Sequence, residues 1–122
     1  MVDRIEFIEK YLSEKILEDR VLRKAVYKEF QEAVEVMSDI CALARRGLNS
    51  SARDDYSNIN FLVEKGILEK EMGKKLKEAN GLRNRLIHEY DGVNDKMAYQ
   101  SMKELVDYLK NFSVVILEWI RK

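Results

Sequence analysis

The chain has 122 residues, of which 46% are hydrophobic and 36% charged, and it contains no proline, one cysteine and one histidine. These values are typical of one soluble, mostly helical domain over residues 1–122, with no room for a second. Because 22 basic and 22 acidic side chains give a formal net charge of zero, the chain lacks the strongly basic balance of proteins that hold long nucleic acids by their phosphates. Any contact with RNA must therefore be local.

The sequence also indicates where in the cell the protein resides and whether it binds a cofactor. The longest apolar runs, such as residues 114–117, fall far short of the roughly 20 residues that span a bilayer, and Asp3, Arg4 and Glu6 argue against a signal peptide. A cytoplasmic protein with no membrane contact is expected. Cys41 lies on an apolar helical stripe, which predicts a buried packing role. One cysteine and one histidine do not form the usual nitrogen and sulfur metal site. No metal or other cofactor is therefore expected, although a site made of carboxylates alone stays open.

Two helices are predicted before the first loop. Asp3 and Glu6 resemble a capping box, and apolar residues then repeat at helical spacing up to Leu17. A long second helix is predicted from Asp19 to Gly47, with the glycine as its C-terminal cap. Its apolar seam alternates steps of four and three residues: Leu22, Val26, Phe30, Ala33, Met37, Ile40 and Ala44.

The next two helices follow a polar loop at residues 48–51. Asp54 or Asp55 can cap a short helix that ends at Gly66. The helix after it stops near residues 91–92. Its apolar stripe consists of Leu68, Met72, Leu76, Ala79, Leu82 and Leu86.

Two glycines, Gly73 and Gly81, lie inside this fourth helix. Each costs about 1 kcal/mol relative to alanine in a helix interior. A bend or a close backbone approach is therefore expected at Gly81, two positions before Arg83.

Asn94 or Asp95 can cap a last helix that runs to the chain end. Its seam again alternates steps of four and three: Ala98, Met102, Leu105, Leu109, Phe112, Ile116 and Trp119. Together these patterns predict an all-α antiparallel bundle of four to five helices.

The only histidine, His88, stands five positions after Arg83 in the stretch RNRLIHEY. On a helix Leu82 and Leu86 share one face, while Asn84 and His88 point almost the opposite way. If the leucines are buried, Asn84 and His88 must face solvent, a cleft or another chain. A lone histidine in a helical protein is more often a surface or packing residue, so the spacing alone does not establish a site.

The stretch RNRLIHEY resembles the R-x4-H-x-Y signature of the HepT-like toxins, members of the HEPN superfamily of helical-bundle ribonucleases. The flanking Gly81-Leu82 and Asp91-Gly92 add to the match, and the helix order from about Phe30 onward is similar as well. The resemblance implies a homodimeric HEPN-type bundle that cleaves RNA at a dimer cleft. It also implies a minimal nucleotidyltransferase antitoxin in a type VII-like toxin–antitoxin system, which forms a larger hetero-oligomer with the toxin and adenylylates Tyr90.

The motif residues suit metal-independent cleavage of RNA. His88 can act as base or acid, because an unperturbed imidazole titrates near pH 6.5. Arg83 can clamp a phosphate with its planar fork of donors. Asn84 can hydrogen-bond His88 or hold a phosphate oxygen.

One histidine cannot be base and acid in the same step, so a single copy of the motif is incomplete. A homodimer that buries Ile87 between two motif helices would supply a second His88, and Glu89 or Tyr90 is the alternative proton donor. A second function stays open: the Arg83–His88 face can belong to a non-catalytic module that binds a nucleotide or a nucleotidyltransferase.

Other charged residues are weaker candidates. Two basic groups can contact RNA, although their interspersed acidic residues favour solvated helix faces. Glu35 and Asp39 fall where HepT-like proteins tend to carry acidic residues, and a solvated or ion-paired face is an equally good interpretation. The basic groups are Arg45, Arg46 and Arg53, and Lys70, Lys74, Lys75 and Lys77.

Overall fold

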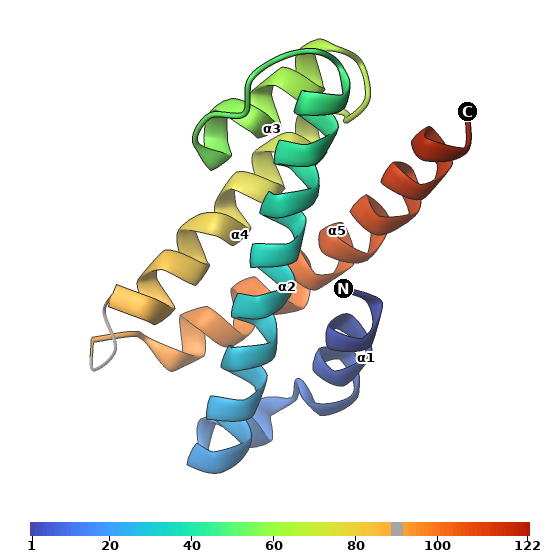
Figure 1. Ribbon diagram of the computed structural model, residues 1–122. Coiled ribbons are helices and arrows are strands. Elements are labelled where there is room, and N and C mark those ends of the chain that lie inside the picture. Colours follow the sequence, from blue (N-terminus) through green and yellow to red (C-terminus); the bar gives the residue numbers. More distant parts are fainter. Residues whose placement is uncertain (89–91) are drawn as a thin grey trace.

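The computed structural model describes residues 1–88 and 92–122, which form five α-helices, one short 3-10 helix and no strand (Figure 1). The α-helices are α1 (Val2–Tyr11), α2 (Arg20–Gly47), α3 (Asp55–Glu64), α4 (Lys70–His88) and α5 (Asp95–Arg121), and the 3-10 helix η1 (Glu14–Leu17) follows α1. The prediction of an all-α bundle is confirmed. No helix in these ranges is long and apolar enough to cross a membrane.

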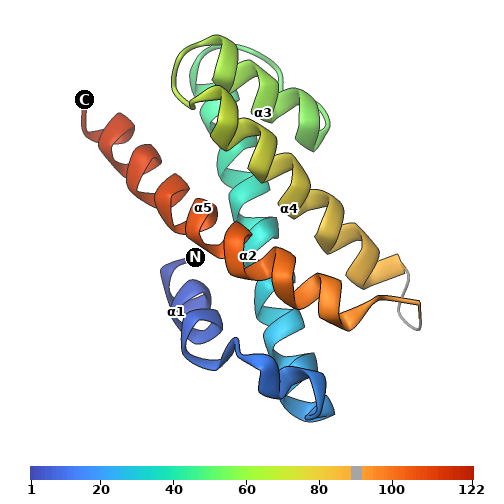
Figure 2. The ribbon, with the colours of Figure 1, turned by 180° about the vertical axis from the view of Figure 1, so that it is seen from behind.

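The long helices α2, α4 and α5 alternate in direction and form the body of the molecule (Figures 1 and 2). Helix α3 packs on α2 and α4 at one end of the bundle, and α1 packs on α2 and α5 at the other. The apolar seams face one shared core, since every residue of the α4 stripe is buried and the α2 seam is buried except for the half-buried Leu22 and Ile40. Trp119 is likewise half-buried at the end of the α5 seam.

Three helices begin at side-chain caps, of which those of α3 and α5 were predicted. The side chains of Asp19, Asp54 and Asn94 each accept a hydrogen bond from the backbone N–H three positions later, at 3.0, 2.9 and 3.1 Å. Each cap satisfies one of the N–H groups that the first turn of a helix leaves without a partner. Gly66, with φ of 75°, follows α3 as predicted.

The prediction of one helix up to Leu17 is wrong. Helix α1 ends at Tyr11, and the Ser13 side chain caps η1 by accepting a hydrogen bond from the Lys15 N–H at 3.3 Å. Serine competes with helical hydrogen bonds in this way, which explains the break. The predicted capping box at Asp3 is also wrong, because the N-cap of α1 is Met1, two residues earlier, and no side chain caps the helix.

The C-terminus of α2 also differs from the prediction. The helix continues through Gly47, and the left-handed residue is Asn49, with φ of 62°. Asparagine tolerates this conformation better than most residues with a side chain. The α2–α3 loop therefore turns two residues later than expected.

The close approach expected at Gly81 occurs at Gly73 instead. A Cβ atom on Gly73 would lie 2.6 Å from Val63 Cγ2 of α3, whereas one on Gly81 would meet only Tyr56 Oη at 3.7 Å. Helix α4 passes through both glycines without a break. The absent side chain at Gly73 lets α3 lie directly on the first half of α4.

Candidate functional site

Residues 83–88 of the motif form the C-terminal end of α4. Leu82 and Leu86 are buried, while Asn84 and His88 are exposed, as the helical spacing predicts. Ile87 on the same outer side is 43% exposed, although it is a large apolar residue. The end of α4 therefore presents a face that is partly polar and partly apolar.

Arg83 behaves differently from His88, because its side chain folds back against α3 and is only 17% exposed. Its Nη2 lies 3.6 Å from Asp55 Oδ2 and donates a hydrogen bond to Asn84 Oδ1 at 3.2 Å. Its Nε is buried and has no hydrogen-bond partner among the described residues. The guanidinium thus lies at the edge of the exposed face.

Of the two roles considered for Asn84, the hydrogen bond to His88 is not formed in the described part of the chain. The Asn84 carbonyl oxygen accepts from Arg83 instead. The His88 side chain is exposed and makes no hydrogen bond or ion pair with residues 1–88 or 92–122. The structure therefore brings Arg83 and Asn84 together and leaves His88 open to solvent or another molecule.

Asp55 is the residue that the sequence interpretation missed. It was considered only as an alternative cap for α3, but Asp54 is the cap. The Asp55 carboxylate instead accepts a hydrogen bond from the buried Asn80 at 3.2 Å and lies next to Arg83. The sequence does contain a signal for this role, because two aspartates stand next to each other at the start of α3. Only one of them can cap the helix, so the other can contact a neighbouring helix.

Cys41 on α2 is fully buried, as predicted. Burial, and then the negative charge of Asp55, raise the pKa of its thiol to about 12. The Asp55 carboxylate of α3 therefore lies close enough to α2 to affect Cys41, and it also contacts Asn80 of α4. Within the described residues no three His, Cys, Asp or Glu side chains gather into a group that could hold a metal ion.

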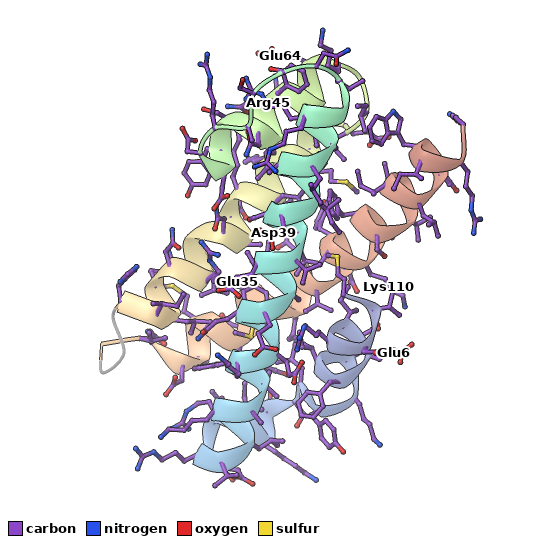
Figure 3. All side chains as sticks on the ribbon, viewed as in Figure 1. Glu6, Glu35, Asp39, Arg45, Glu64 and Lys110 are labelled. Carbon is purple, nitrogen blue, oxygen red and sulfur yellow. The ribbon has the colours of Figure 1, made fainter. Side chains whose placement is uncertain are left out.

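Arg45 is a buried structural residue and not an RNA contact. It is 8% exposed, and it donates to Ser50 Oγ at 3.1 Å and to the Ser57 carbonyl at 3.2 Å. Its guanidinium also stacks 4.6 Å from the centre of the Phe61 ring. Figure 3 shows this side chain beside α3, where it connects the end of α2 to the start of α3.

Among the other charged candidates, Lys75 is ion-paired, whereas Glu35 and Asp39 are exposed and form no ion pair with a described residue. Lys75 pairs with Glu104 at 2.5 Å and Glu78 at 3.4 Å, and the hydrogen bond to Glu104 raises the pKa of this lysine. Glu35 and Asp39 lie exposed, one turn apart on α2 (Figure 3), and form no ion pair with a described residue. No described contact joins either acid to the motif.

A basic groove of about 490 Å³ lies on the opposite side of the α4 end, next to Leu86. Its floor includes Tyr27, whose hydroxyl donates to Asp95 Oδ1 at 2.6 Å, and Arg23 also lies 3.5 Å from Asp95. The groove lining carries four cations and one acid: Arg20, Arg23, Lys24, Lys28 and Asp95. The four cations occur at helical spacing in α2, which is the signal that sequence reading missed.

Two predicted residues cannot be placed. Tyr90, the expected modification site, and Glu89, the alternative proton donor, lie outside the described residues. In the sequence they directly follow His88, the last residue of α4.

The fold and the motif together define a HEPN-type helical bundle that carries an Arg-x4-His pair at the end of α4. The chain belongs to the HepT-like ribonuclease family, which matches residues 1–116.

Curated relatives agree with this family. A protein of Archaeoglobus fulgidus whose name assigns it as an RNase is 34% identical over 115 residues, covering 91% of this chain and 86% of the relative. The tRNA nuclease HepT of Aphanizomenon flos-aquae is 27% identical over 101 residues, covering 78% of this chain and 62% of the relative.

Solved structures with the same fold come from toxin–antitoxin complexes. A tri-AMPylated Shewanella oneidensis HEPN toxin in complex with an MNT antitoxin has a TM-score of 0.80 and 19% identity, over 96% of both chains. A toxin–antitoxin structure with AMP-PNP has a TM-score of 0.79 and 18% identity, covering 94% of this chain and 95% of that chain. At these identities the likeness establishes the fold.

Proposed function

We propose that this protein is a metal-independent endoribonuclease toxin of a type VII-like HEPN/MNT system, with Arg83 and His88 as catalytic residues and Asn84 in support. One observation carries the proposal: in a chain of the HepT-like family, Asn84 and His88 stand exposed at the end of α4 with the Arg83 guanidinium fixed at their edge. The relatives that are named as RNases support the same reaction class.

The proposed reaction forms a bond between the ribose 2′-oxygen and phosphorus and breaks the bond from phosphorus to the 5′-oxygen. One imidazole takes the proton from the 2′-hydroxyl, and a second group protonates the leaving 5′-oxygen. Arg83 stabilises the negative charge that develops on the phosphate. The products are a 2′,3′-cyclic phosphate and a free 5′-hydroxyl.

A homodimer supplies the second proton donor in this scheme. The exposed Ile87 gives the outer face of α4 an apolar centre, which a two-fold pairing of α4 ends would bury beside two copies of His88. Light scattering of the purified protein at micromolar concentration should give the mass of a dimer. A monomer at that concentration contradicts the shared cleft.

Regulation is proposed to act on Tyr90, two positions after His88 in the sequence. Adenylylation by a partner nucleotidyltransferase antitoxin would add bulk and negative charge beside the motif and close it to RNA. The tri-AMPylated state of the Shewanella toxin with its MNT antitoxin supports this. Incubation with the partner enzyme and ATP should add mass to the peptide that contains Tyr90, whereas mass on another residue refutes the assignment.

Cleavage of RNA in EDTA tests the central claim. The wild-type protein should cut single-stranded RNA and leave 2′,3′-cyclic phosphate ends, and His88→Ala should lower the rate by at least 100-fold, in line with loss of a general acid or base. Because His88 is exposed and has no partner among the described residues, the variant should keep wild-type helicity and melting temperature. Asp107→Ala, an exposed change on α5, is the control and should leave cleavage unchanged. Unchanged cleavage by His88→Ala removes this histidine from the mechanism.

A further inference from the structure

Asp55, the first residue of α3, meets two residues of α4 that stand one turn apart. Its Oδ2 accepts a hydrogen bond from Asn80 Nδ2 at 3.2 Å and lies 3.6 Å from Arg83 Nη2. Asn80 is buried and cannot move away, while the Asp55 side chain is 37% exposed. The carboxylate is thus fixed on one side by a buried amide and directed on the other at the motif arginine.

The position of Asp55 is set before any substrate arrives. Asp54 caps the helix through the Ser57 N–H, and Arg45 holds the Ser57 carbonyl from α2. Asn58, one residue further, accepts from the Arg53 N–H at 2.8 Å and donates to the Arg53 carbonyl at 2.9 Å. These contacts tie the first turn of α3 to α2 and to the preceding loop.

The Arg83 guanidinium needs such a partner to be held in one orientation. An arginine on a helix surface samples many rotamers, and its planar fork binds a phosphate well only when the plane is fixed. Both contacts of the Arg83 guanidinium described here, to Asp55 and to Asn84, use Nη2. The Nη1 nitrogen has no partner among residues 1–88 and 92–122, so it can donate to a phosphate oxygen.

We propose that Asp55 is a positioning residue of this site, which orients the Arg83 guanidinium toward the scissile phosphate without touching the RNA. This inference rests on the proposed ribonuclease function. Displacing a catalytic group by about 1 Å can cost about 100-fold in rate, so removal of the Asp55 charge should act on turnover. Loss of one negative charge beside Arg83 should not weaken the binding of an anionic substrate.

Two neighbouring substitutions make a matched test. Asp55→Asn removes the charge that faces Arg83 and keeps an acceptor for Asn80, whereas Asp54→Asn removes the same charge one residue away and keeps a side chain that can cap α3. With a single-stranded RNA substrate, Asp55→Asn should lower kcat by about 10- to 100-fold and leave KM within about threefold. Asp54→Asn should stay within about twofold of the wild type in both constants.

A double mutant shows whether Asp55 acts through Arg83. In the Arg83→Ala background Asp55→Asn should cause no further loss of kcat, because the group that it orients is gone. An equal loss in both backgrounds, or full activity of Asp55→Asn in an active wild-type protein, overturns the positioning role. A wild-type protein that cuts no RNA refutes the proposed function itself.

The motion of the Arg83 side chain can also be measured directly by NMR, which tests the positioning role independently of the ribonuclease activity. The heteronuclear NOE of the Arg83 Nε–H group reports its motion on the picosecond to nanosecond scale. It should be high in the wild type and in Asp54→Asn, and it should fall in Asp55→Asn while the backbone values of α3 and α4 stay the same. An unchanged Arg83 signal in Asp55→Asn overturns the inference.

Discussion

Gly73 shows how one missing side chain sets the distance between two helices. Helix α3 passes so close to it that any Cβ atom would overlap Val63 Cγ2. Valine is stiff about χ1, so Val63 cannot easily turn aside. The contact holds α3 on α4 and, through the same helix, brings Asp55 to Arg83.

The two glycines of α4 should therefore respond in opposite ways to alanine. Gly73→Ala should lower the free energy of unfolding by about 1 kcal/mol, because overpacking costs about 1–3 kcal/mol and the gain in helix propensity returns only about 1 kcal/mol. Gly81→Ala meets no such contact and should raise the free energy of unfolding by about 0.5–1 kcal/mol. Urea denaturation measures both changes.

The control for this pair is Val63→Ala, which removes the atom that a Cβ on Gly73 would overlap. In that background Gly73→Ala should become neutral or stabilising. A loss of the same size with and without Val63 contradicts the steric explanation.

At the level of elements, α3 is the part of the bundle on which the site depends most. It has 10 residues, fewer than the roughly 12–15 that an isolated helix needs for marginal stability in water. Its order comes from the Asp54 cap, the Arg45 contacts and packing on α2 and α4. Substitutions that disorder the first turn of α3 should therefore also disturb the orientation of the Arg83 side chain, because Asp55 connects the two.

The α3 cap should weaken in acid. Hydrogen bonds from the Ser57 backbone and side chain lower the pKa of Asp54, so this carboxylate contributes stability above its unfolded pKa of about 3.9. That contribution is lost as the pH falls through the lower, folded pKa. Asp54→Ala should melt below the wild type at pH 7, and the gap should narrow toward pH 2 as both proteins lose the charged cap.

Thermal unfolding by circular dichroism across this pH range provides the measurement. Asp39→Ala, which also removes one exposed carboxylate, is the control and should melt close to the wild type throughout. A gap for Asp54→Ala that stays constant from pH 7 to pH 2 would show that the charge of the cap is irrelevant.

On the scale of the whole molecule, a net charge of zero conceals an uneven distribution. The lining of the groove on α2 has four cations against one acid, which is paired with Arg23 and Tyr27. Lys28 also lies 3.7 Å from Glu32, which is outside the lining. A local cluster of this kind attracts phosphates even when the protein as a whole is neutral. We expect part of a bound RNA to lie along this groove.

Reversal of two of these charges should test that expectation in the His88→Ala background, where RNA stays intact during binding. Arg20→Glu with Lys28→Glu should weaken binding of a labelled single-stranded RNA by at least tenfold at low salt. The slope of log K against log salt concentration should become shallower by about 0.7 for each phosphate that the groove no longer neutralises. Fluorescence anisotropy at several salt concentrations measures both quantities.

The control carries the same change of charge away from the groove, as Arg121→Glu with Lys65→Glu, both at exposed positions. It should weaken binding much less. Equal losses of affinity in the two double variants would mean that overall charge, and not the groove, determines RNA binding.

The sequence by itself determined the helical elements except for the break between α1 and η1, and it determined their buried faces and the exposed side of the motif. Helical periodicity and capping are local properties, so Leu82 and Leu86 could be assigned to the core and Asn84 and His88 to the outside without any knowledge of the neighbours. The family could also be read from the motif, because Arg83, His88 and Tyr90 stand within eight consecutive residues.

Only the tertiary structure decided how that motif is held. The Asp55–Arg83 and Asp55–Asn80 contacts, the burial of Arg45 and the close approach at Gly73 all join residues from different helices. No periodicity relates such positions, because the register of one helix on another depends on the packing of the whole core. For this reason the sequence placed the close approach at Gly81 and assigned Arg45 to the surface.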